Sequence, residues 1–199
     1  MEKGTRLLLA GCCLIAALTL PPAAAAPAGS APAVHGLARF GGKPVANAVV
    51  WLDAPGAPAA APARRVVLDQ RNLAFSPHVL AVRVGTTVDF PNDDRVFHNV
   101  FSFRDGKVFN LGLYPVGTSR PVKFDRAGLS RIFCNIHPNM AAYVMAVDTP
   151  YFAVSDRDGA FAIPDAPAGS YTFHAWRPGG ADLSGSWTST SGALAVEWP

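Results

Sequence analysis

A seven-residue stretch between two apolar runs constrains the fold of this chain more than any other feature. Residues 134–140 read CNIHPNM and lie between Leu129–Phe133 and Ala141–Val147. Both flanking runs have the length and composition of short β-strands, so the stretch is expected to be the loop that joins them. The loop then carries a thiolate, an imidazole and a thioether at three-residue intervals, from Cys134, His137 and Met140.

This combination of side chains is the one that copper selects. A soft thiolate with imidazole nitrogens and a weak thioether forms the blue-copper site, in which two His and one Cys surround the metal and a Met lies on the axis. The loop provides only one of the two His ligands. His98 can provide the other, at the start of an expected upstream strand in which His98 and Val100 share a face. One copper ion is therefore expected, bound by His98, Cys134, His137 and Met140.

Three of these four residues also have a simpler interpretation. Cys134 is an inert core cysteine in the alternative reading, since free Cys is among the most buried residue types. Met140 is then a core filler, and His98 is a hydrogen-bonded polar residue at the end of a strand. His78 and the pair Asp93 and Asp94 are read as structural, the two aspartates as turn residues ahead of the His98 strand.

The residues around the predicted ligands resemble the cupredoxin family of small blue copper proteins. The segment His98-Asn99-Val100 is similar to the first-ligand segment of plastocyanin and amicyanin, and the spacing of the Cys, His and Met loop is that of amicyanin. The resemblance covers residues 66–148. It implies a Greek-key β-sandwich and a type 1 copper site.

The resemblance also implies a role for each matched residue. His98, Cys134 and His137 are expected as equatorial ligands and Met140 as the axial ligand. Asn99 is expected to tie the first-ligand strand to the Cys loop. Backbone N–H groups near Asn135 are expected to tune the reduction potential.

The beginning of the chain has the pattern of a secretory signal peptide over residues 1–28. Lys3 and Arg6 precede an apolar run, Leu7–Leu20, which is followed by prolines and small residues. The run is shorter than the roughly 20 residues of a membrane span, so export to the periplasm is expected, without a transmembrane span in the mature protein. An alternative is a lipoprotein signal ending at Cys12, although the apolar run continues beyond that residue.

Removal of this segment leaves Cys134 as the only cysteine. The sequence contains 3 Cys, and Cys12 and Cys13 lie in the predicted signal peptide. An exported chain with one Cys forms no internal disulfide, which leaves a buried filler, a free thiol or a metal ligand. The neighbouring His137 and Met140 favour a ligand.

The rest of the sequence indicates an all-β protein with two modules. The 18 Gly and 18 Pro disfavour long helices, and short alternating runs recur between turn residues. We expect strands in residues 34–53, a Pro/Ala-rich linker over 54–64, the cupredoxin domain over 65–148, and further strands with a tail over 149–199. No role is assigned to residues 182–192.

The segments on either side of the cupredoxin region resemble the carboxypeptidase regulatory-like β-sandwich, a module that is usually non-catalytic. The pattern D-x-D-G-x-F matches Asp156–Phe161, P-x-G-x-Y matches Pro167–Tyr171, and G-K-P matches Gly42–Pro44. The pair Asp158-Gly159 predicts a hairpin. We therefore expect a second small sandwich, into which the cupredoxin is inserted or which flanks it.

Four protein ligands leave no open coordination position, so we expect an electron carrier and no enzyme. The resemblance implies that a redox protein, a dehydrogenase or a cytochrome, docks at the edge of His137 beside Ile136 and Pro138. The formal charge of +3 gives no reason to expect nucleic acid. Two alternatives are copper binding or delivery without a redox role, and a β-sandwich binding module without metal. A thiol hydrolase is least supported, because no motif supplies an oxyanion site.

Overall fold

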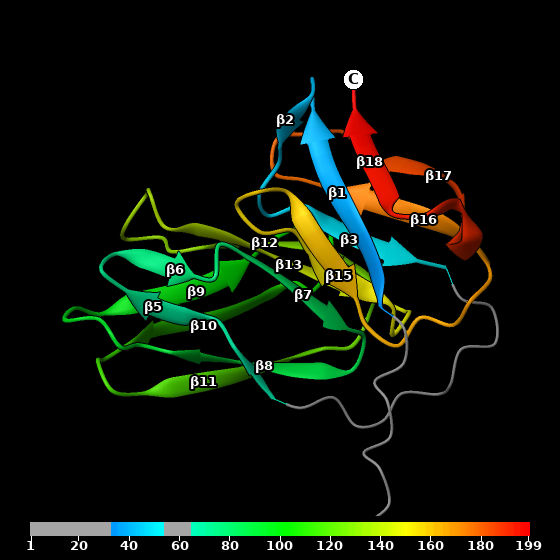
Figure 1. Cartoon of the computed structure of the whole chain (residues 1–199). Coiled ribbons are helices and arrows are strands. Elements are labelled where there is room, and N and C mark those ends of the chain that lie inside the picture. Colours follow the sequence, from blue (N-terminus) through cyan, green and yellow to red (C-terminus); the bar gives the residue numbers. More distant parts are fainter. Residues whose placement is uncertain (1–32, 54–64) are drawn as a thin grey trace, which may run out of the picture.

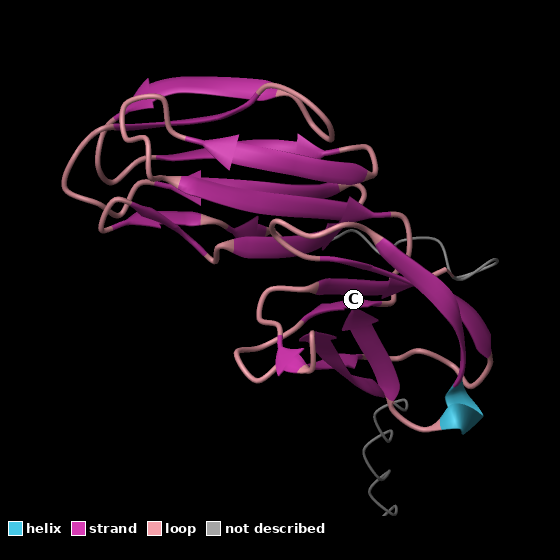
Figure 2. Cartoon of the chain, turned by 90° about the horizontal axis from the view of Figure 1, so that it is seen from above, coloured by secondary structure: helices cyan, strands magenta, loops and turns pink. Residues whose placement is uncertain are grey.

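The computed structural model describes residues 33–53 and 65–199, and this part of the chain is all-β. Figure 1 shows two β-sandwiches side by side, and Figure 2 shows that nearly every regular element is a strand. One short 3-10 helix, η1 (Ser189–Ser191), is the exception among the described residues. The predicted all-β class is confirmed. The predicted signal peptide and the predicted linker over 54–64 lie outside the described residues.

The first sandwich is formed by the middle of the chain. A five-stranded sheet has the order β10-β9-β12-β13-β7, a three-stranded sheet has the order β11-β8-β4, and β5 and β6 form a separate hairpin. The strands are β4 (Val66–Val67), β5 (Asp69–Arg71), β6 (Ala74–Ser76), β7 (Val79–Arg83), β8 (Thr86–Pro91), β9 (His98–Ser102), β10 (Phe109–Tyr114), β11 (Ser119–Phe124), β12 (Gly128–Phe133) and β13 (Ala141–Val147).

The core of the first sandwich follows from period-two alternation. In β8, Val88 and Phe90 are buried, whereas Thr87 and Asp89 are only partly covered. Residues of the five-stranded sheet, including Ile132 and Val144, pack into the same cluster. Cys134 and Met140 belong to this core as well, so the predicted metal loop rests on the end of the sandwich.

The second sandwich combines strands from before and after the first. One sheet has the order β15-β1-β18, with β2 paired to β1, and the other has the order β14-β3-β16-β17. Its strands are β1 (Val34–Phe40), β2 (Lys43–Pro44), β3 (Val49–Leu52), β14 (Phe152–Val154), β15 (Ala160–Ile163), β16 (Ser170–Trp176), β17 (Leu183–Thr188) and β18 (Leu194–Trp198). The first sandwich thus interrupts the second in sequence, between β3 and β14.

One turn of the second sandwich differs from the sequence-based expectation. The Asp158-Gly159 turn does not close a hairpin, because β14 pairs with β3 and β15 pairs with β1 in the other sheet. Asp156 Oδ1 accepts hydrogen bonds from the N–H groups of Asp158 and Ala160, which builds a tight corner between the sheets. Residues 182–192 contribute to β17 and η1, and β17 pairs with β16.

An apolar contact joins the two sandwiches. Val79, Met145 and Val147 from β7 and β13 form one buried cluster with Val49 and Trp176 from β3 and β16. The contact covers part of the outer face of the five-stranded sheet. Within the described ranges, no helix is long and apolar enough to cross a membrane.

Candidate metal centre

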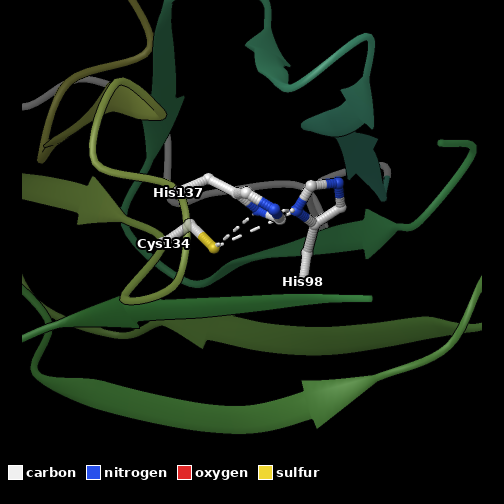
Figure 3. A group of neighbouring side chains, drawn as sticks. All are labelled: His98, Cys134 and His137. Carbon is white, nitrogen blue, oxygen red and sulfur yellow. Dashed lines mark hydrogen bonds between the residues drawn. The ribbon is translucent and has the colours of Figure 1, made fainter. Parts of the chain in front are cut away.

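Three of the four predicted ligands converge at one end of the first sandwich. His98 Nδ1 lies 3.0 Å from His137 Nδ1, and Cys134 Sγ lies 3.9 Å from the former and 3.7 Å from the latter. Figure 3 shows the two rings and the sulfur pointing toward one another, with His98 on a strand and the other two side chains on a loop. Cys134 and His137 lie 36 and 39 positions after His98 in the sequence, and the fold brings the three side chains together.

These distances fit a single transition-metal ion. A metal of the size of zinc bonds His nitrogen at about 2.0 Å and thiolate sulfur at about 2.3 Å, so three donors on one ion lie roughly 3–4 Å apart. The separations of 3.0, 3.7 and 3.9 Å all lie in this range. The donor set of one thiolate and two imidazoles suits copper, for which a thioether is a further ligand.

The strands and the loop itself hold the three donors in place. β9 begins at His98, and Cys134 follows directly after β12, which pairs with both β9 and β13. The loop is closed by two backbone hydrogen bonds: Cys134 N–H donates to Met140 O at 3.3 Å, and Met140 N–H donates to His137 O at 3.0 Å. The loop is therefore anchored at both ends by paired strands.

The two histidines differ in exposure. His98 is fully buried, Cys134 is 5% exposed, and His137 is half-buried. Cys134 is a free cysteine in the described chain. Solvent and other molecules therefore reach this group of donors from the side of His137.

The remaining predicted site residues lie around this group. Met140, the last residue of the loop, is buried in the core of the first sandwich, and its axial role stays a prediction. Asn99 is also buried, but its Oδ1 has no hydrogen-bond partner among the described residues, so the tie to the Cys loop that the resemblance implies stays a prediction too. Asn135 is exposed. His78 lies elsewhere, with Nδ1 3.1 Å from the carbonyl oxygen of Ala141.

Asp94 is a site residue that sequence reasoning assigned only to a turn. Its Oδ2 lies 2.9 Å from His98 Nε2, the ring nitrogen that is not directed at the other donors. Burial raises the pKa of Asp94, but hydrogen bonds from Leu73 N–H, His98 and Arg95 N–H outweigh this and lower the pKa to about 2. In the sequence, this contact is indicated only by the position of Asp94, four residues before the predicted ligand His98.

Comparison with known proteins returns similarity only at the level of solved structures. No protein-family model and no curated protein matches the chain. A purple cupredoxin from Nitrosopumilus maritimus is 29% identical, with 41% of this chain and 99% of that chain covered and a TM-score of 0.38. Amicyanin from Paracoccus versutus is 25% identical, with 49% and 97% covered and a TM-score of 0.39.

A third similar structure is a much longer protein. The copper-containing nitrite reductase from Thermus scotoductus is 26% identical, with 48% of this chain and 25% of that chain covered and a TM-score of 0.41. The chain thus spans a quarter of the length of that reductase. All three alignments cover less than half of this chain, and the resemblance of the second sandwich to the carboxypeptidase regulatory-like module stays a prediction.

Proposed function

We propose that this protein is a type 1 copper protein that carries single electrons between redox partners. The observation that carries the proposal is the convergence of His98 Nδ1, His137 Nδ1 and Cys134 Sγ within 3.0–3.9 Å of one another. These three residues would hold the metal, and Met140 would be the fourth ligand. Copper supplies a one-electron couple between its two common oxidation states.

The residues of the chain keep the donor atoms in one arrangement. Strand pairing fixes His98 and Cys134, and the two backbone hydrogen bonds within the loop limit its movement. A site that does not rearrange between oxidation states lowers the reorganisation that accompanies electron transfer. With four protein ligands there is no position for a substrate, so we assign electron transfer and no catalysis to this site.

Electrons enter and leave at the half-buried edge of His137 in this proposal. The loops next to the site are joined by hydrogen bonds from Leu73 N–H to Asp94 and from Gly117 N–H to Asn92 O. The large apolar side chains exposed on these loops and on the metal loop, here called the apolar rim, are Leu73, Val96, Phe97, Val116 and Ile136. An apolar rim of this kind suits a transient contact with a protein partner, for which we propose a dehydrogenase or a cytochrome.

We also propose that the protein is exported to the periplasm and that the second sandwich is a non-catalytic module of the carboxypeptidase regulatory-like type. The supporting observation for export is the charge and hydropathy pattern of residues 1–28. Export also agrees with Cys134, the free cysteine of the described chain, because a thiolate that binds metal needs no disulfide partner in an oxidising compartment. Sequencing the N-terminus of protein from the periplasmic fraction tests the export.

The visible and electron paramagnetic resonance spectra of the copper-loaded protein test the proposed function. We expect an intense blue band and a reversible one-electron potential. Cys134→Ser is expected to abolish the band, because the hydroxyl does not replace a thiolate ligand, and the apo forms of both proteins should unfold at similar temperatures. A colourless site that releases Cu(I) readily would instead indicate copper delivery, and absence of copper uptake would indicate a module without metal.

A further inference from the structure

The carboxylate of Asp94 lies behind the imidazole of His98, on the side away from the other donors. Asp94 Oδ2 and His98 Nε2 are 2.9 Å apart, and the two side chains are 8% and 0% exposed. Figure 3 shows one ring nitrogen of His98 facing His137 and Cys134 and the other pointing away from them. A neutral imidazole carries one N–H, so the nitrogen that donates to a carboxylate determines which nitrogen keeps its lone pair.

Backbone N–H groups from two loops hold this carboxylate in place. Leu73 N–H donates to Oδ2 at 2.7 Å, and Arg95 N–H donates to Oδ1 at 2.8 Å. The N–H of Asp94 itself donates to Asn92 Oδ1 at 3.2 Å. Each carboxylate oxygen of Asp94 thus accepts a hydrogen bond from a backbone N–H, so the position of the carboxylate does not depend on its contact with His98.

One of these donors comes from a turn with an unusual backbone. Asn72 and Leu73, at the tip of the β5–β6 hairpin, have φ angles of 53° and 59°. Asn is common in this left-handed region, but a Leu there costs about 1–2 kcal/mol. Strained backbone of this kind persists where the surrounding structure requires it, often at functional sites. In this hairpin the strained residue is the one whose N–H is directed at Asp94.

We propose that Asp94 is a positioning residue of the metal centre, and that the tip of the β5–β6 hairpin belongs to the centre through it. The inference rests on the proposed function. Asp94 holds His98 in the tautomer with the proton on Nε2, which leaves the Nδ1 lone pair for the metal. Its buried negative charge also favours the more positive oxidation state of copper. Outer carboxylates on metal-bound histidines are known to orient the ring and to raise its basicity.

The first test is made on the protein without metal. Nitrogen chemical shifts from NMR report the tautomer of His98 in the native protein, in Asp94→Ala and in Asp93→Ala. Asp93 is the matched control, because it lies in the same turn and carries the same charge, but is 47% exposed and pairs with Arg71 at 3.2 Å. We expect the Nε2–H tautomer in the native protein and in Asp93→Ala, and a mixture in Asp94→Ala. An unchanged tautomer in Asp94→Ala would overturn the proposal.

The second test measures copper affinity and reduction potential. Asp94→Ala is expected to lower the affinity for Cu(II) about 10–100-fold, the usual effect of removing an outer partner of a ligand, while Asp93→Ala stays close to the native value. If Cu(II) affinity falls about tenfold more than Cu(I) affinity, the potential rises by about 59 mV. Equal affinities and potentials in the two variants would contradict the role of Asp94.

Two further outcomes keep the inference separate from the proposed function. If the native protein takes up no copper, the proposed function fails, whereas the tautomer measurement still decides the role of Asp94 in orienting His98. If Asp94→Ala does not fold, Asp94→Asn replaces it, since it keeps the size and an acceptor oxygen but not the charge. Its potential is expected to exceed that of Asp93→Asn, and equal potentials would contradict the role of the buried charge.

Discussion

The rings of Tyr143 on β13 and Trp176 on β16 contact each other across the junction of the two sandwiches, with centroids 5.1 Å apart. Tyr143 lies three residues after Met140, so the strand that leaves the metal loop is packed against the second sandwich. The ring of His78 lies perpendicular to the same Tyr143 ring, with centroids 5.4 Å apart. The second sandwich thus supports the strand that anchors one end of the metal loop.

Replacing Trp176 with Ala is expected to destabilise the protein strongly. Trp176 is buried in the cluster that joins the sandwiches, and loss of a buried Trp side chain costs about 3–5 kcal/mol in the free energy of unfolding. Urea denaturation of the apo protein measures this. Val67→Ala is the control, because Val67 is 51% exposed and is expected to change stability by less than about 0.5 kcal/mol. Similar values for both variants would show that the junction contributes little.

The unequal burial of the two histidines predicts unequal rescue by a small ligand. His137 is half-buried, so His137→Gly opens a gap that added imidazole enters from solvent, and the blue band is expected to return. His98 is fully buried, and His98→Gly is expected to stay colourless under the same conditions. Absorption during an imidazole titration measures both. Equal rescue of the two variants would contradict the assigned access route.

Substitution of Met140 tests the axial position. Met140→Leu conserves volume in a buried site, so it is expected to cost less than about 1.5 kcal/mol in stability. It removes the thioether, which tunes the potential of a blue-copper site, while His98, Cys134 and His137 remain. We expect the blue band to persist with a changed reduction potential, measured by voltammetry. An unchanged potential would show that Met140 is only a core residue.

A charge on the apolar rim is expected to slow electron exchange without altering the metal site. Ile136 is 45% exposed on the metal loop, and Ile136→Glu places a carboxylate where an apolar partner surface would dock. Val108→Glu is the control, because Val108 is 56% exposed in the segment after β9, whereas the site lies where β9 begins. Stopped-flow exchange with a redox protein measures the rates. Equal slowing by both variants would argue against docking at the rim.

Tyr114 predicts a loss of stability at high pH. Burial raises its pKa to about 12, against opposing effects of the hydrogen bond from Gln70 and the charge of Arg120. The folded protein keeps the phenol proton to higher pH than the unfolded chain, so the contribution is complete below about pH 10 and is lost as pH rises through about 12.

The pH dependence is measured as a difference between two proteins. Between about pH 9 and pH 12, the native protein is expected to lose about 2 kcal/mol of unfolding free energy that Tyr114→Phe does not lose. The variant also lacks the hydroxyl that donates to Phe90 O, so it is expected to be less stable at neutral pH by about 1 kcal/mol. A constant difference between the two proteins across this pH range would contradict the raised pKa.

Local sequence determined the strands and the spacing of the donors. The apolar runs Leu129–Phe133 and Ala141–Val147 predicted β12 and β13 nearly to the residue, because a strand buries at least one face whatever its partner. The order of Cys, His and Met on a seven-residue loop was also visible, since ligands on one loop are neighbours in sequence. The need for a second His followed from coordination chemistry and pointed to His98.

Only the tertiary structure decided which strands pair and what lies behind the ligands. The Asp158-Gly159 turn has the residues of a hairpin, yet β14 and β15 join different sheets, because β3 and β1 from the beginning of the chain are their partners. Asp94 likewise reads as a turn residue until Leu73 N–H and His98 Nε2 are found at its carboxylate. Alternation in sequence reports which face of a strand is buried, but the partner is selected by contacts between distant segments, which no local pattern encodes.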